Sequence, residues 1–197
     1  MTPQAESILE LFRSTGAYLQ GHFRLTSGLH SAEYLQSALV LQHPQAAEKL
    51  GRLLAAELLA VAGGPVAVVI SPAIGGLIIG QEAARALGAR HIFSERDPGS
   101  GKMILRRGFT VSRGERAVVV EDVITTGGTT KDVIELVRQA NGKVCAAGSI
   151  VDRSGGRADL GVPRVALLTL QVAAHYPEDC PLCRQGIPAV KPGSRPV

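Results

Sequence analysis

Apolar residues recur every three or four positions in several parts of this chain, and this spacing indicates amphipathic helices. The clearest case is 44–62, where Pro44 suits the first turn, leucines form one stripe and Gly63 follows the last turn. The same spacing predicts further helices over 3–16, from the SPAIGG segment to Leu87, and from the TTGGTT segment to Ala140.

Short, continuous apolar runs lie between these helices and indicate strands that are buried on both faces. We expect them at 66–70, 91–94, 118–120, 144–151 and 165–170. Strands that alternate with helices predict an α/β fold with a central, mostly parallel sheet flanked by helices. The length of 197 residues favours one domain over 1–197, with an irregular, proline-rich tail from about 177.

Composition narrows the class of protein. Aromatic residues make up 4% of the chain and Trp is absent, so the core must be aliphatic. The formal net charge of +4 is spread along the chain, which disfavours a nucleic-acid partner. No apolar run is long enough for a membrane span, and the N-terminus lacks the basic region of a secretory signal. With three cysteines, an odd number, a disulfide framework is disfavoured and a cytoplasmic location is expected.

The segment 118–130, VVVEDVITTGGTT, predicts an anion-binding turn at the carboxyl end of a buried strand. Its glycine pair lets backbone N–H groups approach a phosphate, and the threonine hydroxyls and the following helix N-terminus add further attraction. A Walker-type loop and a dinucleotide-binding loop need glycine and lysine spacings that are absent here. The remaining alternative is an ordinary capped helix after a strand.

Two carboxylates, Glu121 and Asp122, stand beside this turn. They oppose a bare phosphate but suit a ligand that also carries a vicinal diol, because a carboxylate accepts hydrogen bonds from two hydroxyls. They also favour a nearby cation, such as Mg²⁺ held on a pyrophosphate. A ribose 5-phosphate with pyrophosphate at C1 supplies all of these groups.

These residues resemble the phosphoribosyl pyrophosphate (PRPP) motif of the type I phosphoribosyltransferases. Over nearly the whole chain the resemblance is to the branch of that family that acts on orotate. FRLTSGLHSAEYLQ resembles its substrate hood, SPAIGG (residues 71–76) its pyrophosphate loop, and IVDRSGG (residues 150–156) the segment whose arginine holds the base. The resemblance implies the type I fold, with a small hood formed by about 1–40 and parts of the C-terminal region.

The resemblance also implies an activity: PRPP and orotate would give orotidine 5′-phosphate and pyrophosphate in pyrimidine synthesis, with Mg²⁺ as cofactor. It implies a homodimer in which each subunit lends a flexible loop to the other's site. PRPP would be bound by Glu121, Asp122, Val123, Ile124, Thr125, Thr126, Gly127, Gly128 and Thr129, and orotate by Thr125 and Arg153. Mg²⁺ would be held mainly by PRPP rather than by direct protein ligation.

For catalysis, cations must meet the charge that grows on the departing pyrophosphate. Our candidates are Lys102 and Arg96 in the loop 94–108, with Asp122 in the turn, and the loop could close as a lid. A plain surface hairpin is the alternative for that loop. The chain departs from the family in three places. The family often carries lysine where this chain has Thr26 and Gly75, and its mobile loop often carries an Arg-Lys pair with a further Lys and a His, where this chain has Arg96, Lys102, Arg106 and Arg107 and no His. Phosphoribosyl transfer to a purine base and a PRPP-sensing regulator stay open as alternatives.

A cysteine motif near the C-terminus is not explained by the resemblance to the phosphoribosyltransferases. Cys180 and Cys183, with His175 nearby, have the spacing of half a structural zinc site. Such a site could be completed across a dimer, or the two thiols could simply lie in a loosely ordered tail. The other histidines are expected to be structural or exposed, namely His22, His30, His43 and His91.

Overall fold

The computed structural model of the chain describes residues 2–25 and 27–192 and divides them into two compact units. The larger unit is the continuous segment 41–170. The smaller unit combines residues up to Val40 with those from Gln171. Thr26, one of the positions that depart from the family pattern, lies outside the described residues.

The larger unit is built on a sheet whose strands run in the order β5-β4-β3-β6-β7-β8. All neighbouring pairs are parallel except β4 and β5, which confirms the mostly parallel sheet. The chain leaves β3 toward β4 on one side and leaves β6 toward β7 on the other, so the strand order reverses between β3 and β6. The strands are β3 (Val68–Pro72), β4 (Arg90–Arg96), β5 (Met103–Leu105), β6 (Arg116–Ile124), β7 (Lys143–Asp152) and β8 (Arg164–Thr169).

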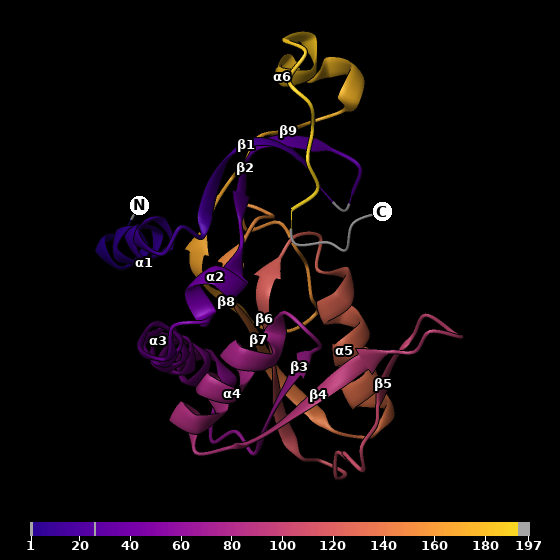
Figure 1. Cartoon of the computed structure of the whole chain (residues 1–197). Helices are drawn as coiled ribbons and strands as arrows, with labels where there is room; N and C mark the ends of the chain where they lie inside the picture. Colours follow the sequence, from indigo (N-terminus) through magenta and orange to yellow (C-terminus); the bar gives the residue numbers. More distant parts are fainter. Residues whose placement is uncertain (1, 26, 193–197) are drawn as a thin grey trace. The chain divides into compact units, whose positions relative to one another are not determined.

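Helices cover both faces of this sheet (Figure 1). α3 (Pro44–Ala62) and α4 (Gly76–Leu87) pack on one face, and α5 (Gly128–Gln139) packs on the other. α3 begins at a proline and ends at Gly63, whose φ of 65° is in the left-handed region, as the sequence predicts. Along β6 the alternation of side chains buries both faces, because Val118, Val119 and Val120 are all fully buried.

The smaller unit contains a three-stranded antiparallel sheet in the order β1-β2-β9. The last described segment returns to this sheet, because Val190 N donates to the His22 carbonyl at 2.9 Å and Arg24 N donates to Val190 O at 2.8 Å. The elements of this part of the chain are α1 (Pro3–Ser14), β1 (Tyr18–Arg24), β2 (His30–Leu35), α2 (Ser37–Leu41), β9 (Ala174–His175), the 3-10 turn η1 (Pro177–Asp179) and α6 (Pro181–Arg184).

Three local expectations differ from the structure. Strand β6 continues through Glu121 and Asp122 to Ile124, although the sequence placed both carboxylates in a turn. The stretch from 177, expected to be irregular, contains η1 and α6. The loop 94–108 contains an antiparallel pairing of β4 with β5, so it is a hairpin with a turn at 97–102. Among the helices described, none combines the length and apolar character that a membrane crossing requires.

Candidate active site at the strand reversal

A pocket of about 280 Å³ lies at the carboxyl ends of β3 and β6, where the strand order reverses. Ligands of open parallel sheets bind at such a point, because two loops leave the sheet in opposite directions and a crevice opens between them. The pocket is lined by Pro72, Ala73, Gly75, Glu121, Asp122, Val123, Ile124, Thr125, Thr126, Gly127, Gly128, Thr129 and Thr130. All nine residues expected to bind PRPP are therefore in one pocket.

The anion-binding turn, residues 125–129, joins β6 to α5. Gly127 has a φ of 82°, which side chains other than glycine rarely adopt, and it is the N-cap of α5. A Cβ at this position would also lie 2.7 Å from a Leu160 methyl carbon. The next residues begin the helix, so N–H groups of its first turn and its positive dipole end face the pocket. The Thr125 and Thr126 side chains are exposed there.

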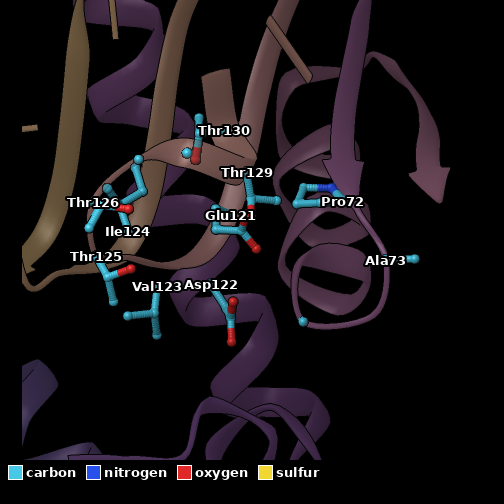
Figure 2. Close-up of a pocket in the computed structure, with 13 residues that line it drawn as sticks. Pro72, Ala73, Glu121, Asp122, Val123, Ile124, Thr125, Thr126, Thr129 and Thr130 are labelled. Atoms are coloured by element: carbon cyan, nitrogen blue, oxygen red, sulfur yellow. The ribbon is translucent and has the colours of Figure 1, made fainter. Parts of the chain in front are cut away.

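Glu121 is the most buried ionisable group of the pocket, with 8% of its surface exposed. Burial, together with the neighbouring Asp122 carboxylate, raises its pKa to about 9. Glu121 is therefore protonated at neutral pH. Figure 2 shows the two side chains between Thr125 and Thr126 on one side and Pro72 and Ala73 on the other. Such a pair can both donate to and accept from a diol.

Gly75, the pyrophosphate-loop position that departs from the family, lies beside the Asp122 carboxylate. A Cβ at Gly75 would lie 2.7 Å from Asp122 Oδ1 and 3.0 Å from its carboxyl carbon. Contacts below 3.0 Å are sterically excluded, so a lysine at 75 would require Asp122 to move. The glycine at this position is thus matched to the placement of Asp122.

The neighbouring strand β7 ends in the loop that carries Arg153. Arg153 N donates to the Ile124 carbonyl at 2.8 Å, so this residue leaves the sheet beside the end of β6. Asp152, which is 1% exposed, holds the loop: its carboxylate accepts from Ser154 N at 2.7 Å and from Gly156 N at 3.1 Å, and it pairs with Arg164. Burial raises the pKa of Asp152, but these hydrogen bonds and Arg164 outweigh it and lower the pKa overall.

Asp152 was not among the residues singled out from the sequence. Its signal in the sequence was its position directly after the apolar run 144–151 and directly before Arg153, where a buried carboxylate can order a loop. Arg153 itself does not belong to the residues lining the pocket, within the described part of the chain.

The two cations proposed for catalysis lie elsewhere in the larger unit. Lys102 is exposed and, with Asp132 and Glu135, lines a second hollow of about 290 Å³ beside α5. Arg96 donates to the Gly101 carbonyl at 2.5 Å and to Asp132 Oδ2 at 3.2 Å. Neither is among the described residues that line the pocket of their own chain.

The cysteine motif belongs to the smaller unit. Cys180 and Cys183 lie close to His22 and His30, whereas His175 is not part of that cluster. The spacing of the two cysteines pointed to their half of the cluster, but nothing in the sequence indicated that His22 and His30 lie beside them. Both histidines are buried, as a structural role predicts.

The fold and the pocket define a phosphoribosyltransferase. The chain matches the family model described as phosphoribosyl transferase domain over residues 37–175, which span the whole of the larger unit.

Comparison with individual relatives narrows the class. The chain is 57% identical over 192 residues to the orotate phosphoribosyltransferase of Pelotomaculum thermopropionicum and 53% identical over 192 residues to that of Desulforamulus reducens, each alignment covering 98% of both chains. It superposes on the crystal structure of orotate phosphoribosyltransferase from Aeropyrum pernix with a TM-score of 0.69 and 28% identity, over 83% of this chain and 94% of that one. The chain belongs to the orotate phosphoribosyltransferase family, as the sequence predicted.

Proposed function

We propose that the pocket at the strand reversal is where this chain transfers the phosphoribosyl group of PRPP to orotate, giving orotidine 5′-phosphate and pyrophosphate. The observation that carries the proposal is the combination, in one pocket, of a glycine-threonine anion-binding turn with two adjacent carboxylates. The turn suits a 5′-phosphate and the carboxylates suit ribose hydroxyls. A purely phosphate-binding site would have no use for the carboxylates.

The roles of the individual residues follow from their places. Residues 125–129 surround the 5′-phosphate with backbone N–H groups and hydroxyls, and Val123 and Ile124 form the wall beneath the ribose. Glu121 and Asp122 bind its hydroxyls. Thr125, at the start of the turn, and Arg153, at the adjacent strand end, bind orotate. Arg153 suits this partner because a planar guanidinium pairs well with the carboxylate of an acidic pyrimidine.

The chemistry breaks the C1–O bond with little help from the nucleophile, so positive charge develops on the ribose and negative charge on the departing pyrophosphate. Asp122 lies near the developing positive charge of the ribose, and its carboxylate can stabilise that charge. Mg²⁺ would be held mainly by PRPP and would supply positive charge to the leaving group when bound. Lys102 and Arg96 supply the rest from the hairpin that contains β4 and β5.

We further propose that the functional unit is a homodimer, acting in the cytoplasm, in which each hairpin serves the partner's pocket. The placement of Lys102 supports this, because it points into a hollow beside α5 and not into its own chain's pocket. A loop that closes from the partner would bring the cation to the pyrophosphate and exclude water.

The activity is tested with a spectrophotometric assay of the full chain with PRPP and Mg²⁺, offering orotate, hypoxanthine, xanthine, guanine and uracil in turn. Turnover of orotate alone supports the proposal. Turnover of a purine in place of orotate would overturn the choice of base, and PRPP binding without turnover of any base would favour a regulator.

The shared site is tested by mixing two inactive variants, Lys102→Ala and Asp122→Asn, under conditions that allow subunits to exchange. If the hairpin acts on the partner, each heterodimer has one pocket with both Asp122 and Lys102 intact, and activity recovers to about a quarter of wild type in an equal mixture. If the hairpin acts on its own chain, every heterodimer pocket carries one defect and no activity returns. The second result would refute the shared site.

A further inference from the structure

Four potential metal ligands converge in the smaller unit. They come from three separate segments: His22 from β1, His30 from β2, and Cys180 and Cys183 from the start and first turn of α6. One ligand atom from each lies within 4.8 Å of all the others. His22, His30 and Cys180 are buried, and Cys183 is half-buried. The cluster thus has the composition of a Cys₂His₂ metal site.

The nitrogen–sulfur distances suit one small ion among the four ligand atoms. His22 Nε2 lies 3.4 Å from Cys180 Sγ and 3.8 Å from Cys183 Sγ, and His30 Nδ1 lies 3.2 Å from Cys183 Sγ. The two ring nitrogens are 2.8 Å apart. A tetrahedron with ordinary Zn–N and Zn–S bond lengths has edges of roughly 3.3–3.8 Å. The three nitrogen–sulfur distances fall at or close to these values, whereas the two ring nitrogens are closer together and would have to move apart around an ion.

Hydrogen bonding within the cluster is incomplete without a cation. His22 Nδ1 lies 2.7 Å from the Ile187 carbonyl, which only accepts, so His22 carries its proton on Nδ1. Its Nε2 therefore has a single lone pair, and that lone pair faces His30 Nδ1 and both sulfurs. Only one of these three neighbours can donate to it. A metal ion accepts all four lone pairs at once.

The surroundings of the ligands have the arrangement that metal sites use to orient their first ligands. The Ile187 carbonyl fixes the tautomer and ring position of His22, as the second partner of a metal-bound histidine usually does. Backbone N–H groups of Leu182 and Cys183 are directed at the Cys180 sulfur.

We propose that His22, His30, Cys180 and Cys183 of one chain bind a structural Zn²⁺ ion. Two thiolates and two imidazoles in tetrahedral array favour zinc, and four protein ligands leave no open position for catalysis. The ion joins the β1–β2 hairpin to the segment that follows β9, which Figure 1 shows leading through α6 and back along the hairpin. α6 has four residues and β9 has two, so this part of the chain has little regular structure of its own to hold it.

One chain supplies all four ligands of this site, so it differs from the alternative in which a zinc site is completed across a dimer. It does not depend on the proposed transferase activity, since none of the four residues lines the pocket at the strand reversal. A site of this kind that closes a loop of about 160 residues restricts the unfolded chain strongly.

The test is the metal content of the purified full chain, without an affinity tag, after dialysis against metal-free buffer containing a reductant. We expect about one zinc ion per chain in the wild type, and less than a tenth of that in Cys183→Ser and in His30→Ala. Cys145→Ala and His43→Ala are the matched controls, because Cys145 lies in β7 and His43 is exposed at the start of α3. Both should keep the full zinc content.

A second measurement decides the matter even if the ligand variants do not fold. Wild-type chain stripped of metal by a chelator is titrated with Co²⁺, and we expect intense tetrahedral d–d bands with thiolate-to-cobalt charge transfer, saturating at about one equivalent. Addition of Zn²⁺ should abolish these bands. Wild type that carries no zinc and gives no thiolate-cobalt bands would overturn the proposal, as would unchanged zinc in Cys183→Ser. Orotate turnover is measured separately, so failure of either proposal leaves the other standing.

Discussion

Replacement of Glu121 by glutamine tests the electrostatics of the pocket directly. The pKa of Glu121 is about 9 in the folded chain because burial and Asp122 oppose its charge, against an ordinary glutamate value near 4.5 in the unfolded chain. A folded-state pKa above the unfolded value stabilises the fold fully below the unfolded pKa, and this contribution is lost as pH rises toward 9. Glutamine has nearly the same shape and does not titrate.

The size of the effect follows from the two pKa values. Each pKa unit corresponds to about 1.4 kcal/mol, so the Glu121 contribution falls by at most about 4 kcal/mol between pH 5 and pH 8. Glu121→Gln removes this loss. The free energy of unfolding of the variant relative to wild type should therefore rise with pH across this window, by a few kcal/mol.

The measurement is urea unfolding of wild type and Glu121→Gln at pH 5, 6.5 and 8, with the difference taken at each pH so that other titrating groups cancel. Glu115→Gln is a control of opposite sign. The Glu115 carboxylate accepts from Arg90 Nε at 3.0 Å, and this hydrogen bond lowers its pKa. That variant should be less stable than wild type by a constant amount from pH 8 to pH 5. The deficit should shrink only below about pH 4.5, where the carboxyl of the unfolded chain becomes protonated, so a measurement at about pH 3.5 is added for this pair. A Glu121→Gln difference that stays constant to within about 0.5 kcal/mol from pH 5 to 8 would refute the reasoning.

Three further substitutions probe the site. Lys102→Ala should lower kcat at least tenfold with unchanged urea unfolding, whereas Lys143→Ala, an exposed lysine on β7, should leave kcat unchanged; equal kcat values for the two would remove Lys102 from the mechanism. Gly127→Ala should raise the Kd for PRPP at least tenfold, measured by calorimetry, because the residue has a φ of 82° and no room for a Cβ; an unchanged Kd would show that the turn does not bind the phosphate. Asp152→Asn should lower the free energy of unfolding by about 3 kcal/mol, because Arg164 would lose its buried partner, and should raise the KM for orotate; a variant as stable as wild type in urea would contradict this.

The main elements of the larger unit were predictable because each is specified locally. The leucine stripe of 44–62, bounded by Pro44 and Gly63, matches α3 to the residue. Continuous apolar runs located the parallel strands. The anion-binding turn was equally local, since strand, glycine pair and helix follow one another without a gap.

Contacts between distant segments were not predictable in the same way. The spacing of Cys180 and Cys183 indicates a metal site, but His22 and His30 lie about 150 residues earlier in the chain. Strand pairing and the return of Val190 to β1 bring the two pairs together. From the sequence, Gly75 could only be described as a departure from the lysine that the family often carries. Nothing in the sequence shows that the Asp122 carboxylate fills the adjacent space. The pKa of Glu121 likewise depends on burial, which strand β6 provides by extending further than its apolar run.

The division of the chain has a consequence for its synthesis. Residues 41–170 form one unit without interruption, while the other unit needs both the first 40 residues and those after 170. On the ribosome the continuous unit can acquire its structure while the remainder is still being made. The proposed zinc site of His22 and His30 cannot be completed until the segment with the two cysteines has been synthesised. Synthesis of the last residues, together with the supply of zinc, would then decide when the smaller unit completes its folding.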